Sequence, residues 1–169
     1  MDVDQAFEEV KKKAYRLLSY RPQSIRELRT KLLDKGYAAV DVERVIVRFT
    51  ELKFLDDEAF AKGWARSLAV NRLWGDRRIY VRLREKGIDT ALIDDAIRET
   101  REELTEEDAV EKLLIKKYGK NISSTLHFNS FSAKEKRRII QYVTSRGFPA
   151  GLLLEVLRKP KEEYTDDRE

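Results

Sequence analysis

Three short stretches, Lys35-Gly36-Tyr37, Lys86-Gly87-Ile88 and Arg146-Gly147-Phe148, repeat one pattern of a basic residue, a glycine and an apolar residue. An apolar pattern of helical period precedes each stretch, as with Leu28 and Leu32 before the first. Glycine just beyond a helix end adopts the left-handed conformation without a Cβ clash, and the next apolar residue folds back onto the last turn. The basic residue stands where the helix dipole is negative. We therefore interpret each stretch as a stop signal that ends a helix.

The chain also matches itself beyond these stop signals. A shift of 51 residues places Arg26 on Arg77 and Ile46 on Ile97, and a shift of 111 places Arg26 on Arg137. Such matches of charged and apolar positions indicate an internal repeat of about 50 residues. One three-helix unit of this size is marginal alone, whereas tandem copies support one another. The sequence predicts an all-α fold of three tandem three-helix repeats that form an elongated, curved stack.

Helix start signals agree with this repeat. Ser24 to Glu27 and Ser132 to Glu135 have the pattern of capping boxes, and Asp56 is a candidate cap. Nine helices are expected, at about residues 5–20, 24–35, 39–53, 57–72, 76–86, 90–103, 106–118, 133–146 and 150–158. The repeats then cover 1–55, 56–104 and 105–158, with an irregular loop at 119–131 and a flexible tail at 159–169.

Charge is abundant and arranged in blocks. Charged residues make up 39% of the 169 residues, and the net charge is +4. Residues 11–35 hold nine basic and two acidic side chains, 89–111 hold two basic and ten acidic, and 112–146 hold nine basic and one acidic. Basic blocks of this kind can offer a positive surface to a polyanion or to an acidic partner.

Several features that the sequence lacks limit the expected cellular location and the expected chemistry. There is no cysteine, no apolar run of 18 residues and no signal-peptide pattern in Met1 to Gln5, so we expect a cytoplasmic protein that does not span a membrane. The single histidine has no evident ligand companions, and acidic pairs such as Asp56-Asp57 fit helix caps. With no phosphate loop or nucleophile elbow, we expect neither an enzyme nor a cofactor or metal.

The basic residues are the better functional candidates, because they recur on the helix that each stop signal ends. The candidate partner or DNA-binding residues are Arg26, Arg29, Lys31, Lys35, Arg77, Arg78, Arg82, Arg84, Lys134, Lys136, Arg137 and Arg138. If equivalent helices share a face, these side chains form a positive track. The alternative is that they only solubilise exposed helix surfaces.

Two groups of aromatic residues are interpreted mainly as residues that pack against the rest of the fold. Phe60 and Trp64 lie four residues apart and are assigned to the core, and Gly63 between them is expected to permit a close helix contact. Trp74 is expected to pack over the turn before Gly75, with stacking on a base or a partner side chain as the alternative.

Four stretches together carry a resemblance to a known family. Residues 21–37, 54–64 and 75–88, followed by Arg146-Gly147-Phe148, resemble in order the motifs of the RecX family, which regulates the RecA recombinase. The resemblance covers about residues 8–158. It implies three tandem three-helix repeats in a monomer that binds the RecA–DNA filament and inhibits its ATP hydrolysis and strand exchange. Single- or double-stranded DNA is a further implied contact.

Two other functions remain open from the residues alone. Three-helix units can place a helix against DNA, so the chain could be a stand-alone DNA-binding helical module whose affinity falls steeply with salt. It could also be a scaffold for a different acidic protein. Binding that requires the filament distinguishes the RecA hypothesis from both.

Overall fold

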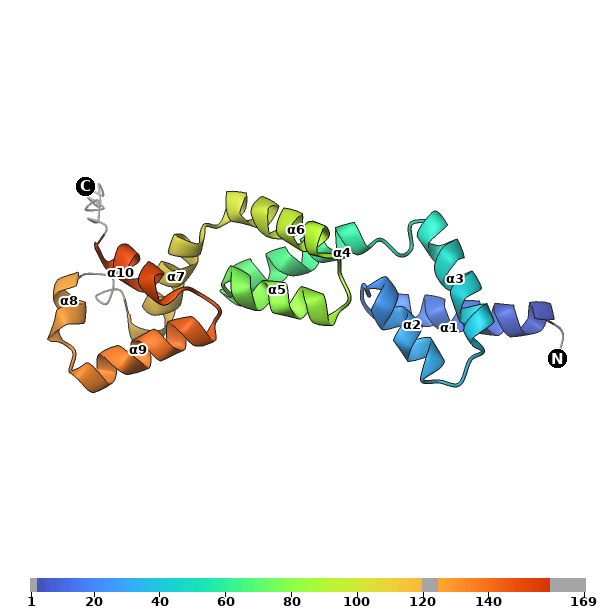
Figure 1. Ribbon diagram of the computed structural model, residues 1–169, viewed down its shortest axis with the longest axis horizontal. Coiled ribbons are helices and arrows are strands. Elements are labelled where there is room, and N and C mark those ends of the chain that lie inside the picture. The colour runs from blue at the N-terminus through green and yellow to red at the C-terminus, as the bar shows by residue number, and fades with distance from the viewer. Residues whose placement is uncertain (1–2, 120–124, 159–169) are drawn as a thin grey trace, which may run out of the picture. The chain divides into compact units, whose positions relative to one another are not determined.

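The computed structural model describes residues 3–119 and 125–158, and these ranges are helical without a β-strand (Figure 1). The α-helices are α1 Val3–Tyr20, α2 Ile25–Leu33, α3 Ala39–Glu51, α4 Asp57–Arg66, α5 Asp76–Glu85, α6 Thr90–Glu103, α7 Glu106–Tyr118, α8 Thr125–Ser130, α9 Ala133–Ser145 and α10 Ala150–Arg158. A π-helix, η1 Ser67–Asn71, follows α4 directly. The all-α prediction is confirmed, and the predicted tail at 159–169 lies outside the described residues.

Helices α2, α5 and α9 end just before the glycines of the stop signals. Gly36, Gly87 and Gly147 have φ angles of 83°, 81° and 95°, in the left-handed region that favours glycine. The Gly36 amide donates to the Leu33 carbonyl at 2.8 Å, and the Gly87 amide donates to the Arg84 carbonyl at 2.9 Å. The stop-signal interpretation is therefore confirmed at all three positions.

The two predicted capping boxes differ in the structure. At Ser132 the hydroxyl accepts from the Glu135 amide at 3.3 Å, and the Glu135 carboxylate accepts from the Ser132 amide at 2.8 Å, so the box forms. Ser24 accepts from the Glu27 amide at 3.1 Å, but the Glu27 carboxylate bonds Arg21 at 2.5 Å. The box prediction is wrong for that half, because a guanidinium is a stronger partner for a carboxylate than a backbone amide.

The chain divides into two compact units. The first combines residues up to 67 with 80–100, and the second combines 68–79 with residues from 101 onward. In the first unit α1 packs on α2 and α3 over Val10, Ala14, Leu28, Leu32, Val42, Val45, Ile46, Phe49 and Leu55. In the second unit α10 packs on α7, α8 and α9 over residues that include Leu113, Leu114, Ile139, Val143, Leu153 and Val156. The three-repeat division stays a prediction, since residues 56–104 contribute to both units.

The expected irregular loop at 119–131 is wrong in part. Residues 125–130 form α8, so the described ranges hold ten α-helices where nine were expected. Phe128 on α8 is buried in the core of the second unit, and its ring lies 6.5 Å from that of Phe131. A helix of six residues is too short for apolar periodicity to reveal it in the sequence. Residues 120–124 lie outside the described part of the chain.

The segment predicted as one helix at 57–72 changes its geometry midway. It is α-helical to Arg66 and then forms the π-helix η1, a geometry that is common at functional sites. Phe60 is buried as expected, but Trp64 is only half-buried, so its assignment to the core is wrong. Gly63 is exposed, and apart from its own helix backbone and its neighbours Lys62 and Trp64 no atom lies within 4 Å of the place a Cβ would take. The expected close helix contact at Gly63 is therefore wrong too.

Candidate interaction surface

The end of α5 meets the start of α2 within the first unit, and we call this contact the first joint. The Ser24 hydroxyl donates to the carbonyl oxygen of Lys86 at 2.7 Å. A Cβ on Gly87 would lie 2.2 Å from Cδ of Arg26, closer than atoms can approach. The stop signal that ends α5 therefore packs on the first turn of α2, and a Cβ at position 87 would require Arg26 to move.

The end of α9 meets the start of α5 in the same way within the second unit, and we call this contact the second joint. The Gly75 amide donates to the carbonyl oxygen of Arg146 at 2.9 Å. A Cβ on Gly147 would lie 2.5 Å from Cβ of Arg78, and a Cβ on Gly75 would lie 2.6 Å from the carbonyl carbon of Gly147. Backbone meets backbone here, with no room for a side chain on either glycine.

A carboxylate completes each joint. The Ile25 amide at the start of α2 donates to Asp57 Oδ1 at 2.9 Å, and the Asp76 amide at the start of α5 donates to Glu106 Oε1 at 2.8 Å. Asp57 and Glu106 are the first residues of α4 and α7. Burial raises the pKa of both carboxyl groups, and the accepted amide hydrogen bond opposes that rise.

The two joints thus share one plan, although the donor to the stop-signal carbonyl is a hydroxyl in the first and a backbone amide in the second. Each holds a stop signal, the first turn of α2 or α5, and the first carboxylate of a following helix. This plan is a second reason for the repeated stop signals, and the interpretation as helix ends alone missed it. The acidic residues Asp57 and Glu106 were the available signal, because each directly follows a helix cap, Asp56 before α4 and Thr105 before α7.

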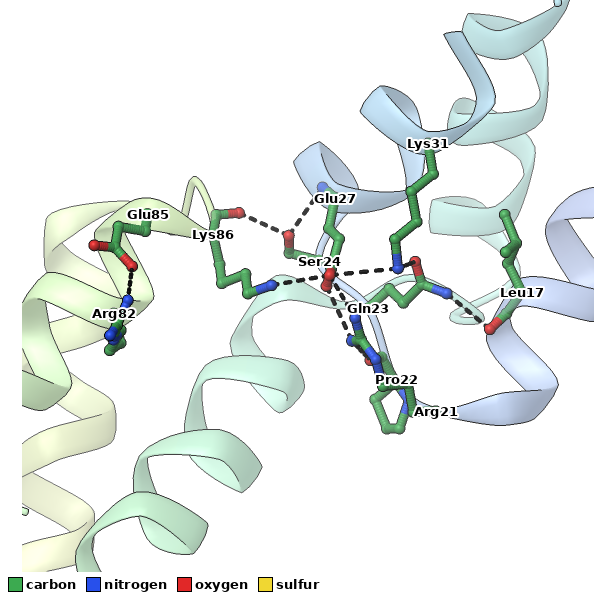
Figure 2. Close-up of polar contacts among 10 residues, drawn as sticks. All are labelled: Leu17, Arg21, Pro22, Gln23, Ser24, Glu27, Lys31, Arg82, Glu85 and Lys86. Atoms are coloured by element: carbon green, nitrogen blue, oxygen red, sulfur yellow. Dashed lines mark hydrogen bonds and ion pairs between the residues drawn. The ribbon is translucent and has the colours of Figure 1, made fainter. Parts of the chain in front are cut away.

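The side chains at the first joint are charged (Figure 2). Arg21 Nη2, Lys86 Nζ and Lys31 Nζ lie 2.5, 2.9 and 3.4 Å from Glu27 Oε1. Burial by itself raises the pKa of Glu27, but the hydrogen bonds from Arg21 and Lys86 outweigh it and lower the pKa from 4.5 to about 2. Three cations therefore converge on one carboxylate that stays ionised.

The side chains at the second joint combine an aromatic ring with two arginines. Trp74 is buried as expected, and Cζ of Arg78 lies 4.0 Å from the centroid of its ring. Arg78 also donates to the Ser145 carbonyl at 2.7 Å. Arg101 donates to the Trp74 carbonyl at 2.9 Å and to Asp76 at 2.7 Å. These contacts fix the turn that carries Gly75.

A pocket of about 560 Å³ lies beside the first joint, and we call it the Trp64 pocket. Its lining residues are Arg21, Pro22, Ala59, Phe60, Gly63, Trp64, Ser67 and Lys86. None of them is among the candidate binding residues that the sequence indicated. The pattern of a tryptophan beside a helix glycine was the available signal, and it was assigned to packing instead.

A larger hollow of about 770 Å³ lies along α1 and α3. Its apolar lining includes Val40, Val47 and Leu52, all of them exposed. The cations around it are each paired with a carboxylate of the same helix, in the pairs Lys11–Glu8, Arg44–Asp41 and Arg48–Glu51. Charge at this hollow is therefore balanced, unlike charge at the first joint.

The four predicted cations on and after α2 fall into three situations. Arg26 is exposed and, with Lys31, lines a hollow of about 330 Å³. Arg29 is held by Glu43 on α3 at 2.6 Å. Lys31 joins the Glu27 cluster, and Lys35 is exposed. Within the described residues, Arg26 and Lys35 form no hydrogen bond or ion pair.

On α5 the predicted cations also differ in the contacts that they make. Arg78 is half-buried in the second joint, as described. Arg82 pairs with Glu85 at 2.7 Å, and Arg84 donates to a backbone carbonyl at 3.2 Å. Arg77 is exposed, and no hydrogen bond or ion pair holds it in the part of the chain that the structure describes.

On α9 three of the four predicted cations are exposed, namely Lys134, Arg137 and Arg138. Lys136 is half-buried and donates to the Asn129 carbonyl at 3.2 Å. Across the described ranges, Lys134 and Arg137 make no hydrogen bond or ion pair. The continuous positive track over α2, α5 and α9 remains a prediction.

Over 3–119 and 125–158, no group of three or more histidine, aspartate or glutamate side chains is placed to hold a metal ion. No helix in the same ranges has the length and apolar character needed to cross a bilayer.

The fold and the joints define a class of proteins in which small helical domains follow one another along the chain. Comparison with known proteins identifies the family within this class. The sequence matches the first three-helix domain of RecX over residues 11–49 and the second three-helix domain of RecX over residues 56–97. It is 31% identical over 150 residues to regulatory protein RecX of Mycolicibacterium smegmatis, covering 89% of this chain and 78% of that protein. The chain belongs to the RecX family.

Other relatives and solved structures agree with this assignment. Regulatory protein RecX of Pelodictyon phaeoclathratiforme is 33% identical over 135 residues, which cover 80% of this chain and 78% of the relative. The crystal structure of RecX from Lactobacillus salivarius superposes with a TM-score of 0.75 at 18% identity, covering 92% of this chain and 97% of that one. This structural likeness supports the fold.

Proposed function

We propose that this protein regulates the RecA recombinase by binding the RecA–DNA filament and inhibiting its ATPase and strand-exchange activities. Membership of the RecX family supports the proposal, and so do relatives named regulatory protein RecX. The protein needs no chemistry of its own for this role, because binding that favours one filament state shifts the population toward that state. We further propose that it acts as a cytoplasmic monomer built of three repeats.

One observation selects the residues of the binding surface. Arg26, Arg77 and Arg137 each stand ten residues before a left-handed glycine, on α2, α5 and α9. Each is exposed and, within the described residues, makes no hydrogen bond or ion pair. Guanidinium groups without an internal partner can bind phosphate or carboxylate without first breaking a contact. We propose these three arginines as the core of the surface, with Lys35, Lys134 and Arg138 beside them.

Titration of RecA ATPase activity on single-stranded DNA tests the function. We expect turnover to fall as the protein is added, and a variant with Arg26, Arg77 and Arg137 all changed to glutamate to inhibit at least tenfold less well. Arg98→Glu is the matched control, because Arg98 is an exposed arginine on α6 whose one ion pair among the described residues is with Asp95. Unchanged turnover at saturating protein would contradict the function, and equal inhibition by the triple variant would remove these arginines from the surface.

The same arginines also fit the alternative of a stand-alone DNA-binding helical module. That alternative predicts tight binding to duplex DNA without RecA, with an affinity that falls steeply as salt rises. Fluorescence anisotropy of a labelled duplex, measured with and without RecA, separates the two functions.

A further inference from the structure

Gly63 has no packing role that the structure reveals, although it stands inside α4. Glycine in a helix interior lowers stability relative to alanine. Here the φ angle is not in the left-handed region, and apart from the backbone of α4 and the neighbours Lys62 and Trp64 no atom lies within 4 Å of the position of an added Cβ. Gly63 lines the Trp64 pocket, so the space that its missing side chain leaves belongs to that pocket.

Trp64 stands beside this space in a fixed position. Its ring lies 5.0 Å from the buried ring of Phe60, in an edge-to-face arrangement. The indole is only half-buried, and it lines the pocket together with Pro22 and Ala59. A rigid aromatic side chain beside apolar neighbours is the kind of surface on which binding energy concentrates.

The edge of the pocket carries a surplus of positive charge. Arg21 and Lys86 line it, and both share Glu27 with Lys31. One carboxylate against three cations leaves two net positive charges. Because the pKa of Glu27 is about 2, this balance holds throughout the physiological pH range.

We propose that the Trp64 pocket is a docking site for an acidic protein segment that inserts one large apolar side chain. The apolar side chain occupies the space over Gly63, against Ala59 and Trp64. Carboxylates on either side of it meet Arg21 and Lys86. None of the residues that line the pocket is among the residues of the proposed filament surface, so the proposal does not depend on the filament function. The two sites adjoin at Lys86, which also lines the hollow that contains Arg26.

A protein segment fits the pocket better than a nucleic acid does. Nucleobases bind aromatic side chains by stacking on the face of the ring. Lys86 Nζ lies over the face of the Trp64 ring, 5.0 Å from its centroid. An apolar side chain over Gly63 needs only the empty space and leaves Lys86 in place, where its ammonium, shared with Glu27, can meet a second carboxylate.

The two tryptophans provide a direct measurement. In the ¹⁵N-labelled full chain, each indole N–H gives one NMR signal, assigned with the variant Trp64→Phe. The probe is a short synthetic peptide with one phenylalanine flanked on both sides by aspartate and glutamate. We expect a saturable shift of the Trp64 signal and none of the Trp74 signal, which serves as an internal control because Trp74 is buried in the second joint.

Two control ligands separate the rival explanations. The same peptide with serine in place of phenylalanine should bind at least tenfold more weakly, and a thymidine oligonucleotide should bind more weakly than the acidic peptide. No shift of Trp64, equal binding of the serine peptide, or tighter binding of the oligonucleotide would each overturn the proposal.

A matched pair of alanine variants tests the space itself. Gly63→Ala and Gly151→Ala each add one methyl group at an exposed helix glycine with no atom outside its own helix nearby. Both variants should raise Tm or leave it unchanged, so loss of folding cannot explain a loss of binding. Gly63→Ala should weaken peptide binding by about tenfold, the effect of one methyl group in an apolar pocket. Equal binding by the two variants would contradict the proposal.

A second pair tests the charge. Lys86→Gln should weaken binding of the acidic peptide several-fold, whereas Lys53→Gln should not, because Lys53 lies outside the pocket and is exposed. Equal effects would show that only the net charge of the protein matters and would overturn the placement of the site.

Discussion

The first and second joints join equivalent positions through different groups, since the stop-signal carbonyl accepts from the Ser24 hydroxyl in the first and from the Gly75 amide in the second. In both, a stop signal packs on the first turn of α2 or α5, and a carboxylate accepts the first amide of that helix. In the first joint Gly87 meets the side chain of Arg26, whereas in the second Gly147 meets backbone atoms of Arg78. A change of the Arg26 rotamer would relieve the approach of its Cδ at 2.2 Å but not that of its Cβ at 2.7 Å, whereas no side-chain movement relieves the approach to the backbone nitrogen of Arg78. The first joint can therefore yield in part, and the second cannot.

The residues at equivalent positions explain much of this difference. A shift of 51 residues places Glu27 on Arg78. Glu27 gathers Arg21, Lys31 and Lys86 around the first joint, whereas Arg78 stacks on Trp74 in the second. A repeated contact thus supports an electrostatic joint in one place and a sterically fixed joint in the other.

The largest expected effect separates the two joints by glycine substitution. Gly147→Ala should lower the free energy of unfolding by about 3 kcal/mol, because it adds left-handed strain and a clash with backbone atoms. Gly87→Ala should cost less, since Cδ of Arg26 can move away and the close approach to its Cβ at 2.7 Å is what remains. Gly36→Ala should lower the free energy of unfolding by only about 1 kcal/mol, the strain of a left-handed φ angle, because the added Cβ would have no atom within 4 Å.

Urea unfolding followed by circular dichroism measures this series. Gly36→Ala is the matched control, with the same left-handed φ and no joint contact. If Gly147→Ala and Gly36→Ala cost the same, the close approach at the second joint contributes nothing to stability. If Gly87→Ala costs as much as Gly147→Ala, the first joint is as rigid as the second.

The glycines also show how much of the structure could be predicted from the sequence. Local rules predict a left-handed glycine wherever a helix ends in this pattern, and they hold at Gly36, Gly87 and Gly147. The same rules do not distinguish Gly36, where an added Cβ would have no atom within 4 Å, from Gly147, where an added Cβ would clash with Arg78. That distinction depends on residues 69 positions apart in the chain, and a local pattern does not carry it.

Removing the charge of Glu27 should have the next largest effect. Glu27→Gln leaves three cations close together without their carboxylate, and we expect a loss of about 2 kcal/mol. In the wild type the folded-state pKa is about 2, below the ordinary 4.5. The stabilisation is therefore complete above pH 4.5 and is lost as the pH falls from 4.5 toward 2.

The indole NMR signals of Trp64 and Trp74 report on the two joints separately. Acid should perturb the Trp64 signal first, and Glu27→Gln should remove that pH dependence while leaving the Trp74 signal unchanged. High salt should weaken the Glu27 cluster in the same direction, because its cations are partly exposed. A Trp74 signal that changes together with that of Trp64 would contradict the separation of the joints.

The candidate site was harder to predict than the fold. Twelve cations could be selected by recurrence, but recurrence does not reveal which of them already have a partner, as Arg29 does in Glu43. Trp64 and Gly63 have the spacing of a packed helix face, and their exposure depends on which neighbours reach them. The half-formed capping box at Ser24 has the same origin, since Lys86 comes from a distant part of the chain.

The smallest expected effect concerns the part that the joints share. Asp57→Asn and Glu106→Gln keep an oxygen that can accept the Ile25 or Asp76 amide, so each should change the free energy of unfolding by no more than about 0.5 kcal/mol. Burial raises the pKa of both carboxyl groups, so ionisation costs stability above the raised pKa, and the neutral amides avoid that cost. Alanine at either position leaves the backbone amide without its acceptor and should cost about 1 to 2 kcal/mol.

If the amide and alanine variants unfold at the same urea concentration, the hydrogen bond is not what these carboxylates contribute. If the two joints respond alike, their common plan includes this bond, and their differences come from Glu27 and Arg78.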